Sequence, residues 1–467
     1  MAGIVSRLGF WLGILIGIAV HLTPPFGGLS DPAQITLAIT ALMVIWWVTE
    51  AIHISATALL PIVLIPLLGI GTIAQATSPY ANPVIFLFMG GFLLAAALER
   101  SRLHTRLALG IVALIGASPH RLILGFLVTS SLLSMWISNT ATAMMMLPIA
   151  LSVGSIGSDY GNTDKGIAAL LLSVAIGSNL GGIGTLIGTP PNAIMLGYLS
   201  QNHNIEMGFG EWMRIGVPLV VVSLPIFYLI LKKSMAFEAT VNDAVISKEV
   251  QAQRLALGPW SISEIRVSIV FSMTASLWIF QSLFKPYLPG ISDAGISILA
   301  GLSLFLIADG KKSTLLEWKD AEKIPWGVLI LFGGGLSLAE VIQTTNLAQW
   351  IGDSMSALAV LPVPLIIFLV AISIIFFSEV ASNSATSAAI IPVMGALAVS
   401  LGYDPRIFVI PATLAATMAF MLPVGTPPNA IVFSSGKIKQ SEMIRVGFWL
   451  NLASAILITI AMTLYMM

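Results

Sequence analysis

Apolar stretches of membrane-spanning length follow one another along almost the whole chain. They occupy residues 8–22, 35–50, 54–70, 83–98, 167–200, 215–231, 266–283, 292–308, 327–343, 406–433 and 446–465. A helix needs about 20 consecutive, mostly apolar residues to cross the hydrocarbon of a bilayer. The pattern therefore predicts an all-α polytopic membrane protein with about 11 membrane-spanning helices.

Two further apolar stretches, 120–153 and 363–399, each carry a polar triplet near the middle. Each could cross the membrane once, or enter and leave on the same side as a re-entrant hairpin. With two hairpins and a cytoplasmic N-terminus, every lysine and arginine lies inside except Arg214, Lys285 and Arg406. Because basic residues concentrate on the cytoplasmic side of membrane proteins, the hairpins are favoured. The C-terminus is then predicted to lie outside.

Composition agrees with a membrane protein. Charged residues make up 9% of the chain and hydrophobic residues 57%, whereas soluble globular proteins carry roughly 25% charged residues. A soluble enzyme and a disordered protein are excluded. The formal net charge is zero, so there is no basic excess to neutralise nucleic acid. Cysteine is absent, and the five histidines form no pair with metal-ligand spacing.

Three motifs occur twice in the same order. The first two pairs are shifted by 244 positions and the third by 237; they are 88–91 with 332–335, 138–142 with 382–386, and 188–194 with 425–431. Such self-similarity indicates an internal duplication. The predicted topology gives the two copies opposite orientations. Inverted repeats are typical of secondary transporters, whose substrate site lies near the membrane midplane between the repeats.

The duplication divides the chain into four predicted units. They are an N-terminal helix at 1–34, a first repeat at 35–231, a cytoplasmic linker at 232–262 and a second repeat at 263–467. The predicted hairpin tips lie near 138–140 and 382–384, and the predicted broken helices near 188–192 and 425–429. The linker is polar, and we expect part of it to form an amphipathic helix at the membrane surface.

The Ser-Asn-Thr/Ser triplets within the two interrupted stretches are candidate site residues. A single triplet would be read as polar groups that bond to the backbone or join helices. A second copy at the matching position favours a functional reading. A hairpin tip exposes backbone amides and carbonyls, which are tolerated at membrane depth only where they line a cavity or are buried in protein.

The Gly-Thr-Pro-Pro-Asn runs should interrupt their helices, because proline removes a backbone hydrogen bond and clashes within a helix. A simple kink is the alternative. Interrupted membrane helices offer half-helix N-termini to anions and free carbonyls to cations. Thr189 and Thr426 add hydroxyl donors. Asn192 and Asn429 are expected to bond to the freed backbone groups.

An anion at these motifs would lack a formal positive partner from the protein. Lys437 is the one basic residue near them in the sequence. Removing an ion from water costs several kcal/mol even after the protein relaxes. A co-bound cation would offset that cost, and hydroxyl, amide and carbonyl oxygens suit sodium. The sequence therefore motivates cation-coupled anion transport.

Three glutamates lie in or beside apolar segments, where ionisable groups are functional candidates. Glu379 precedes the second triplet, and two roles stay open for it: cation binding or proton relay, and structural pairing near the hairpin tip. Glu50 is expected to anchor structure near the cytoplasmic end of its helix. Glu99 adjoins Arg100 and is expected at the interface.

These motifs resemble the divalent anion/sodium symporter family, which includes solute carrier 13 and the bacterial dicarboxylate transporters. The likeness extends from Trp-Trp-Val-Thr-Glu at 46–50 to Gly-Thr-Pro-Pro-Asn at 425–429. The resemblance implies a homodimer with two re-entrant hairpins, and an elevator motion of a transport domain against a dimerising scaffold. It implies sodium ions as the co-transported species and no organic cofactor.

The resemblance also implies specific site residues. The first sodium site would use Ser134, Ser138, Asn139 and Gly188, and the second Ser378, Ala381, Asn383 and Gly425. Substrate carboxylates would meet Asn139, Thr140, Thr189 and Pro190 from one repeat, and Ser382, Asn383, Ser384, Thr426 and Pro427 from the other. Ser384 departs from the threonine typical of dicarboxylate transporters, and His53 from a usual proline.

The function predicted from these features is sodium-coupled import of C4-dicarboxylates such as succinate, malate or fumarate across a plasma membrane, the inner membrane in a bacterium. Sodium-independent exchange, and transport of sulfate or citrate, remain open within the family. An anion channel and an intramembrane enzyme that uses Glu379 are alternatives of other classes. The duplication speaks against an enzyme, since catalysis does not require two copies of a broken helix.

Overall fold

The computed structural model describes residues 2–116, 118–155, 163–235 and 243–466. The regular structure in these ranges is helical, apart from one isolated β-bridge between Ala308 and Thr314. The prediction of an all-α protein is therefore confirmed. Part of the predicted linker, 236–242, lies outside the described residues.

The first half of the chain begins with a helical pair and ends with a long helix. Its elements are α1 (Ala2–Leu22), α2 (Asp31–Thr49), α3 (Ile54–Thr57), α4 (Leu60–Leu67), α5 (Ile73–Thr77), η1 (Ser78–Ala81), α6 (Pro83–Arg100), α7 (Leu103–Ile115), α8 (Pro119–Ser134), α9 (Asn139–Ser155), α10 (Thr163–Gly182), η3 (Leu186–Gly188), α11 (Pro190–His203) and α12 (Phe209–Met235).

The second half starts with the helix of the linker. Its elements are α13 (Asp243–Ala256), α14 (Ile262–Ile279), α15 (Gln281–Phe284), α16 (Asp293–Leu306), α17 (Trp318–Ala321), α18 (Trp326–Thr344), α19 (Leu347–Ser354), η4 (Ser356–Val360), α20 (Val363–Ser378), α21 (Asn383–Ser400), α22 (Arg406–Thr417), α23 (Pro427–Ser434) and α24 (Gln440–Tyr465).

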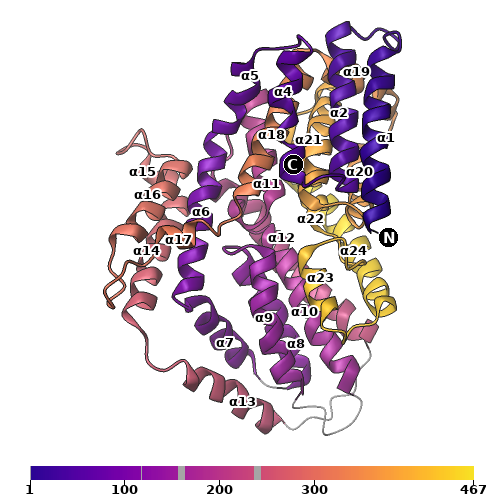
Figure 1. The fold of residues 1–467 in the computed structure, drawn as a ribbon. Helices are drawn as coiled ribbons and strands as arrows, with labels where there is room; N and C mark the ends of the chain where they lie inside the picture. The colour runs from indigo at the N-terminus through magenta and orange to yellow at the C-terminus, as the bar shows by residue number, and fades with distance from the viewer. Residues whose placement is uncertain (1, 117, 156–162, 236–242, 467) are drawn as a thin grey trace.

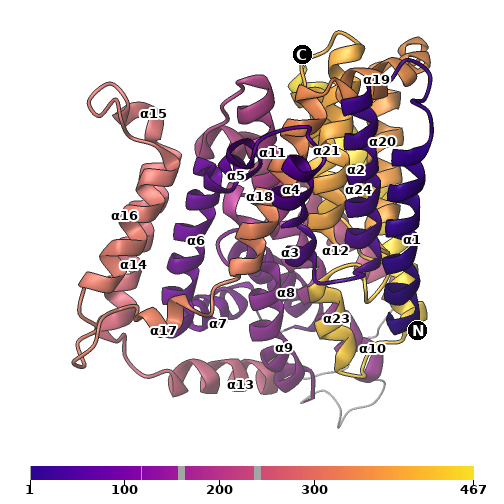
Figure 2. The ribbon, with the colours of Figure 1, turned by 45° about the horizontal axis from the view of Figure 1, so that its top comes forward.

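Nine helices of the described ranges are long and apolar enough to cross a membrane. Eleven crossings stay a prediction, because three of the expected stretches are each divided into two helices, and of these helices only α10 is itself long enough to cross a membrane. Residues 54–70 contain α3 and α4, 167–200 contain α10 and α11, and 406–433 contain α22 and α23. Figures 1 and 2 place α14 and α16 at one edge of the molecule and α1 with α2 at the opposite edge.

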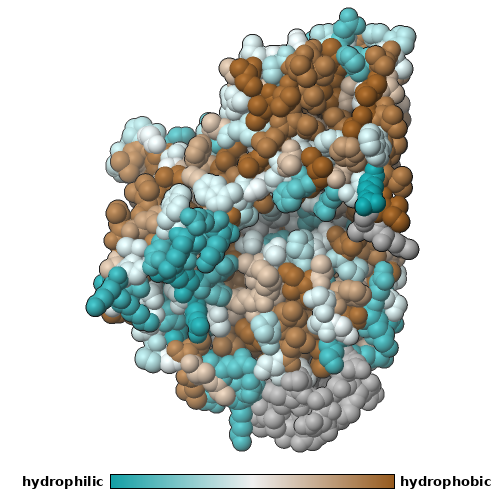
Figure 3. Space-filling model, viewed as in Figure 1, coloured by the Kyte–Doolittle hydropathy of each residue, from teal (hydrophilic) through white to brown (hydrophobic). Residues whose placement is uncertain are grey.

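The outer surface of α1 is strongly apolar. Leu8, Trp11 and Leu15 each expose more than half of their surface. Figure 3 shows hydrophobic side chains gathered over the upper part of the face where α1, α2 and α4 lie in Figure 1. A contiguous exposed apolar surface marks an interaction site with protein or membrane. The hydrocarbon of a bilayer is the surrounding that this surface fits.

Small residues let the interior helices approach closely. Gly177 and Gly181 on α10 face α8, where an added Cβ would overlap the carbonyls of Leu127 and Ser131. Small residues at helix crossings are typical of membrane proteins, because dispersion contacts between closely spaced backbones replace the hydrophobic effect. This crossing holds α8 against α10 directly before the interruption at the end of α10.

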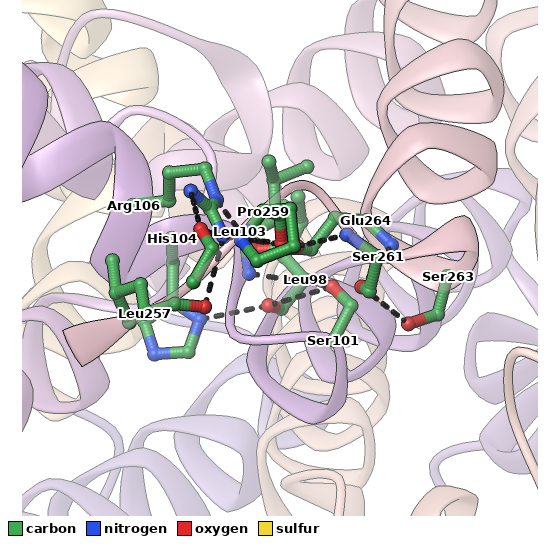
Figure 4. A network of polar contacts seen from close by, with 11 residues as sticks. Leu98, Ser101, Leu103, His104, Arg106, Leu257, Pro259, Ser261, Ser263 and Glu264 are labelled. Atoms are coloured by element: carbon green, nitrogen blue, oxygen red, sulfur yellow. Dashed lines mark hydrogen bonds and ion pairs between the residues drawn. The ribbon is translucent and has the colours of Figure 1, made fainter. Parts of the chain in front are cut away.

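Arg106 on α7 ties the linker to the start of α14, as Figure 4 shows. Its Nε lies 2.7 Å from Glu264 Oε1, and its guanidinium donates to the carbonyls of Leu257, Gly258 and Pro259. Trp260 stacks against the same group at 5.1 Å. The described part of the linker thus holds the last turn of α12, the helix α13 and an anchored stretch that leads into α14.

Candidate functional site

Four helix N-termini hold most of the predicted site residues. The helices α9 and α21 begin at Asn139 and Asn383, one residue beyond short turns that follow α8 and α20. The helices α11 and α23 begin at Pro190 and Pro427. Proline is favoured in the first helical turn, because its missing N–H has no helical partner there. The prolines therefore start helices, and the chain is interrupted just before them.

The first half joins Ser134, Asn139 and Gly188 at the tip between α8 and α9. Ser134 Oγ donates to the carbonyl of Ser178 at 2.6 Å and lies 2.7 Å from the amide of Asn139. With its nitrogen facing inward, the Asn139 amide donates to the carbonyls of Ser178 at 3.1 Å and Gly188 at 3.2 Å. An added Cβ at Gly182 would contact both Asn139 and Thr189. This glycine therefore lets hairpin and interrupted helix meet.

The second half repeats this arrangement. Ser378 Oγ donates to the carbonyl of Ala416 at 2.7 Å and lies 3.1 Å from Asn383 Oδ1. Ser378 and Asn383 follow Ser134 and Asn139 by 244 positions. In both halves, therefore, the same serine bonds to a neighbouring helix and lies within hydrogen-bond distance of the asparagine at its hairpin tip.

The two asparagines after the prolines also match. Asn192 Nδ2 donates to the carbonyls of Gly182 at 3.2 Å and Thr185 at 2.8 Å. Asn429 Nδ2 donates to the carbonyls 237 positions later, those of Ala419 at 3.2 Å and Leu422 at 3.0 Å. The prediction that these side chains bond to freed backbone groups is confirmed.

Glu379 bonds to the interrupted backbone of the second half. Its carboxylate accepts hydrogen bonds from the backbone N–H groups of Phe420, Met421 and Leu422 at 2.7 to 2.8 Å. Asn451 Nδ2 on α24 donates to it at 2.7 Å. Glu379 is buried. Structural pairing, one of the two roles left open for this residue, is what these contacts supply.

The other two glutamates lie apart from these contacts. Glu50 is the exposed C-cap of α2, with a left-handed backbone and its carbonyl bonded to Ser6. Glu99 is exposed near the end of α6.

Each interrupted helix packs against the hairpin of the opposite half. The helix α23 lies against α9 and α10, and α11 lies against α21 and α22. One side chain that the sequence reading missed crosses this boundary: Asn179 Nδ2 on α10 donates to Thr426 Oγ1 at 2.9 Å and Asn429 Oδ1 at 3.3 Å. Asn179 belongs to no duplicated motif. The one sequence feature that could have indicated it is an amide side chain within an apolar helix.

The predicted site residues differ in exposure. Buried are Ser134, Gly188, Thr189, Ser378, Ala381, Ser384, Gly425 and Thr426; half-buried are Ser138, Asn139, Thr140, Pro190, Ser382 and Asn383; Pro427 is exposed. Ser138 caps α9 by accepting from the Ala141 N–H. In the described ranges, no side-chain hydrogen bond joins Thr140, Ser382 or Ser384 to another predicted site residue.

The electrostatic potential at the motifs is set by the partial charges of helix ends and neutral polar side chains. No lysine, arginine or histidine of the described ranges hydrogen-bonds to a predicted site residue. No group of three or more His, Asp or Glu side chains that could hold a metal ion occurs in the same ranges. Helix N-termini attract anions, and clustered neutral oxygens suit hard cations rather than transition metals.

Comparisons with known proteins place the chain among transporters. The model of the family described as "sodium:sulfate symporter transmembrane region" matches residues 6–467. The sodium-dependent dicarboxylate transporter SdcS of Staphylococcus aureus strain USA300 is 43% identical over 436 residues, which cover 90% of this chain and 84% of that protein. SdcS of strain NCTC 8325 gives the same identity and coverage.

Two solved structures share the fold. The YdaH transporter of Alcanivorax borkumensis is 13% identical with a TM-score of 0.57, and the match covers 94% of this chain and 98% of that one. MtrF of Neisseria gonorrhoeae is 14% identical with a TM-score of 0.59, and the match covers 97% of each chain. At these identities the likeness concerns the fold alone.

Proposed function

Because the chain belongs to the sodium:sulfate symporter family, we propose that it imports C4-dicarboxylates such as succinate, malate and fumarate together with sodium ions. Family and relatives are transporters, so the predictions of the family, of an integral membrane protein and of a transporter rather than an enzyme are confirmed. The substrate class and the coupling ion follow the name of SdcS.

The observation that carries the proposal is the paired set of helix N-termini, contributed by both halves and joined across their boundary. A dicarboxylate has two anionic ends and needs two donor sites. The N-terminus of α9 offers one set of backbone N–H groups, and that of α21 offers another. The helices α11 and α23 begin with two prolines that lack N–H groups, and they add the positive end of the helix dipole and the hydroxyls of Thr189 and Thr426. Such termini bind anions without a basic side chain. The substrate residues are those predicted from the family resemblance.

An oxygen cluster supports a sodium site in the first half. Ser134 Oγ and the carbonyls of Ser178 and Gly188 each lie within hydrogen-bond distance of Asn139 Oδ1, and Ser134 Oγ also bonds to the Ser178 carbonyl. Turning the Asn139 amide supplies a donor to this cluster, and a bound cation would hold the same oxygens without that turn. We assign the first sodium to Ser134, Ser138, Asn139 and Gly188.

The matching hydrogen bonds of the second half support a second sodium at Ser378, Ala381, Asn383 and Gly425. The motif spacing supports a duplication, and the distribution of basic residues supports its inverted form with two re-entrant hairpins, a cytoplasmic N-terminus and an outside C-terminus. In this proposal, the hairpins and interrupted helices move together as a transport domain against the remaining helices, which dimerise. Substrate and sodium then cross by an elevator motion.

Uptake of labelled succinate into proteoliposomes tests the function. We expect uptake with an inward sodium gradient and little with potassium in its place. Liposomes preloaded with unlabelled succinate distinguish sodium-independent exchange, and competition by sulfate or citrate identifies another dianion as the substrate. Absence of uptake of every dicarboxylate under all of these conditions would overturn the proposal.

A further inference from the structure

The structure assigns Asn179 a role beyond packing: we propose that it is a positioning residue that turns the Thr426 hydroxyl into a permanent hydrogen-bond donor for one carboxylate of the substrate. This inference rests on the proposed function. It concerns a residue of the first half that sets the chemistry of a residue in the second half.

The orientation starts at Asn429, whose amide cannot turn. Its Nδ2 donates to two backbone carbonyls, those of Ala419 and Leu422. Turning the amide would place its oxygen against both carbonyl oxygens and lose both bonds. Asn429 Oδ1 is therefore an acceptor in the buried space that it shares with Asn179.

The acceptor oxygen of Asn429 in turn determines the orientation of the Asn179 amide. Only the Nδ2 of Asn179 can face Asn429 Oδ1, and the same nitrogen lies 2.9 Å from Thr426 Oγ1. Asn179 Oδ1 is buried and has no hydrogen-bond partner in the described part of the chain. A buried unpaired acceptor is costly, so a gain in function accounts for keeping an amide here.

The Thr426 hydroxyl has its single hydrogen left to donate. A hydroxyl has two acceptor lone pairs and one donor hydrogen. Thr426 Oγ1 accepts from Asn179 Nδ2 and from the backbone N–H of Asn429 at 3.3 Å. Both lone pairs are thus occupied, and the hydrogen points away from both donors at the N-terminus of α23. A donor oriented before binding costs no reorganisation when the anion arrives.

The first half lacks the hydrogen bonds that orient this threonine hydroxyl. Thr189, the counterpart of Thr426, makes no side-chain capping bond at the start of α11. Asn192 Oδ1, the counterpart of the acceptor in Asn429, is buried without a partner in the described ranges. One end of a dicarboxylate would therefore meet an oriented hydroxyl, and the other an unoriented one. The structure predicts that the second half holds the substrate end bound with the stricter geometry.

Kinetics of purified transporter in proteoliposomes test this role. The variants are Asn179→Ala, the isosteric Asn179→Asp, Thr426→Val and the double variant Asn179→Ala with Thr426→Val. Ser173→Ala, on the same buried helix with only a local bond to Leu170, is the matched control. The readouts are KM for succinate, maximal rate and the sodium concentration for half-maximal rate.

We expect Asn179→Ala to raise KM for succinate by about tenfold, the usual consequence of losing an oriented hydrogen bond to a charged group. Asn179→Asp should raise it at least as much, because its carboxylate would capture the Thr426 hydrogen. The sodium requirement should stay within about twofold of wild type, and Asn179→Ala should add nothing to Thr426→Val, as for two residues in one network. Ser173→Ala should match wild type.

Each failure has its own signature. If wild type takes up no dicarboxylate, the proposed function fails. If Thr426→Val leaves KM unchanged, the substrate contact at Thr426 is wrong. If Thr426→Val raises KM and both Asn179 variants do not, or if Asn179→Ala raises KM equally in the Thr426→Val background, the positioning role of Asn179 is overturned.

Discussion

The two halves of the chain hold the same kind of interrupted helix by different means. In the first half, the interruption closes on its own backbone: Gly184 N–H donates to the Gly181 carbonyl at 2.9 Å, and a short 3-10 turn follows. The Thr185 hydroxyl donates to the carbonyl of Met135 at the hairpin tip. This interruption is rich in glycine, so the chain can turn tightly.

In the second half, a carboxylate replaces those backbone bonds. Glu379 occupies the position 244 residues after Met135, and it accepts the N–H groups of Phe420, Met421 and Leu422. Asn451, its further donor, lies four residues after Gly447, which contacts this interruption as Gly216 contacts the first. Val220 lies four residues after Gly216. Glutamate and asparagine thus stand where the first half has methionine and valine.

This difference teaches that duplicated motifs preserve the contacts of the predicted site more strictly than the scaffold around it. Serine, asparagine and the asparagine after the prolines make the same bonds in both halves. The residues that support the interruptions have diverged. The halves should therefore respond alike to changes at the shared serine and asparagines, and unlike to changes at the supports and at Thr189 and Thr426, whose contacts differ.

The largest effect is expected at the shared asparagines. Asn139→Ala removes the side chain that contacts Ser134, Ser178 and Gly188, and Asn383→Ala removes the side chain bonded to Ser378 within the second hairpin. Each should reduce sodium-driven succinate uptake to less than about a tenth of wild type, because ligand contacts and tip geometry are lost together. Size-exclusion profiles in detergent should stay unchanged. Normal transport by both variants would show that the site is elsewhere, and a defect in only one would break the equivalence of the halves.

A swap of the supporting residues should affect the halves unequally. Glu379→Met places the first-half residue in the second half and leaves the N–H groups of Met421 and Leu422 and the amide of Asn451 without their acceptor, while the Phe420 N–H keeps only Asn451 Oδ1 at 3.2 Å. The expected loss of stability is about 3 kcal/mol or more. Met135→Leu conserves volume and should cost less than about 1.5 kcal/mol.

Thermal unfolding of the two purified variants in detergent, with uptake measured in parallel, makes the comparison. The Glu379→Met midpoint should fall well below that of Met135→Leu. Equal midpoints would mean that the carboxylate does not hold the second interruption. Glu379→Gln, which keeps an acceptor oxygen, should lie between Glu379→Met and wild type.

The all-helical fold and the roles of Asn192 and Asn429 could be predicted from the sequence, because apolar periodicity and duplication are visible in a single chain. It placed the interruptions at the prolines, whereas the unwound residues 183–189 and 418–426 precede them. Proline limits where a helix can begin, and glycine and side-chain acceptors decide how far the preceding chain unwinds. The bond from Asn179 to Thr426 joins residues 247 positions apart, a distance that no local pattern spans.

A moderate difference is expected between the two threonines before the prolines. Thr426→Val removes an oriented donor and Thr189→Val an unoriented one. We expect KM for succinate to rise about tenfold in Thr426→Val and about threefold in Thr189→Val. Initial uptake rates over a range of succinate concentrations measure both. A larger rise for Thr189→Val would reverse the assignment of the stricter end.

The smallest effect is expected at Ser384, the counterpart of Thr140 by the shift of 244. Ser384 is buried, whereas Thr140 is half-buried. Ser384→Thr keeps the hydroxyl and adds a methyl group, so binding should survive while the room beside the substrate shrinks.

A single methyl group discriminates between substrates by about tenfold at the low end of the usual range. We therefore expect the inhibition of succinate uptake by malate, fumarate and sulfate to shift by less than that in Ser384→Thr. Thr140→Ser, the reverse change, should shift the same profile weakly in the opposite sense. An unchanged inhibition profile in both variants would show that neither methyl position touches the substrate, and the asymmetry between the halves would then lie in Asn179, Glu379 and Asn451 rather than in these two positions.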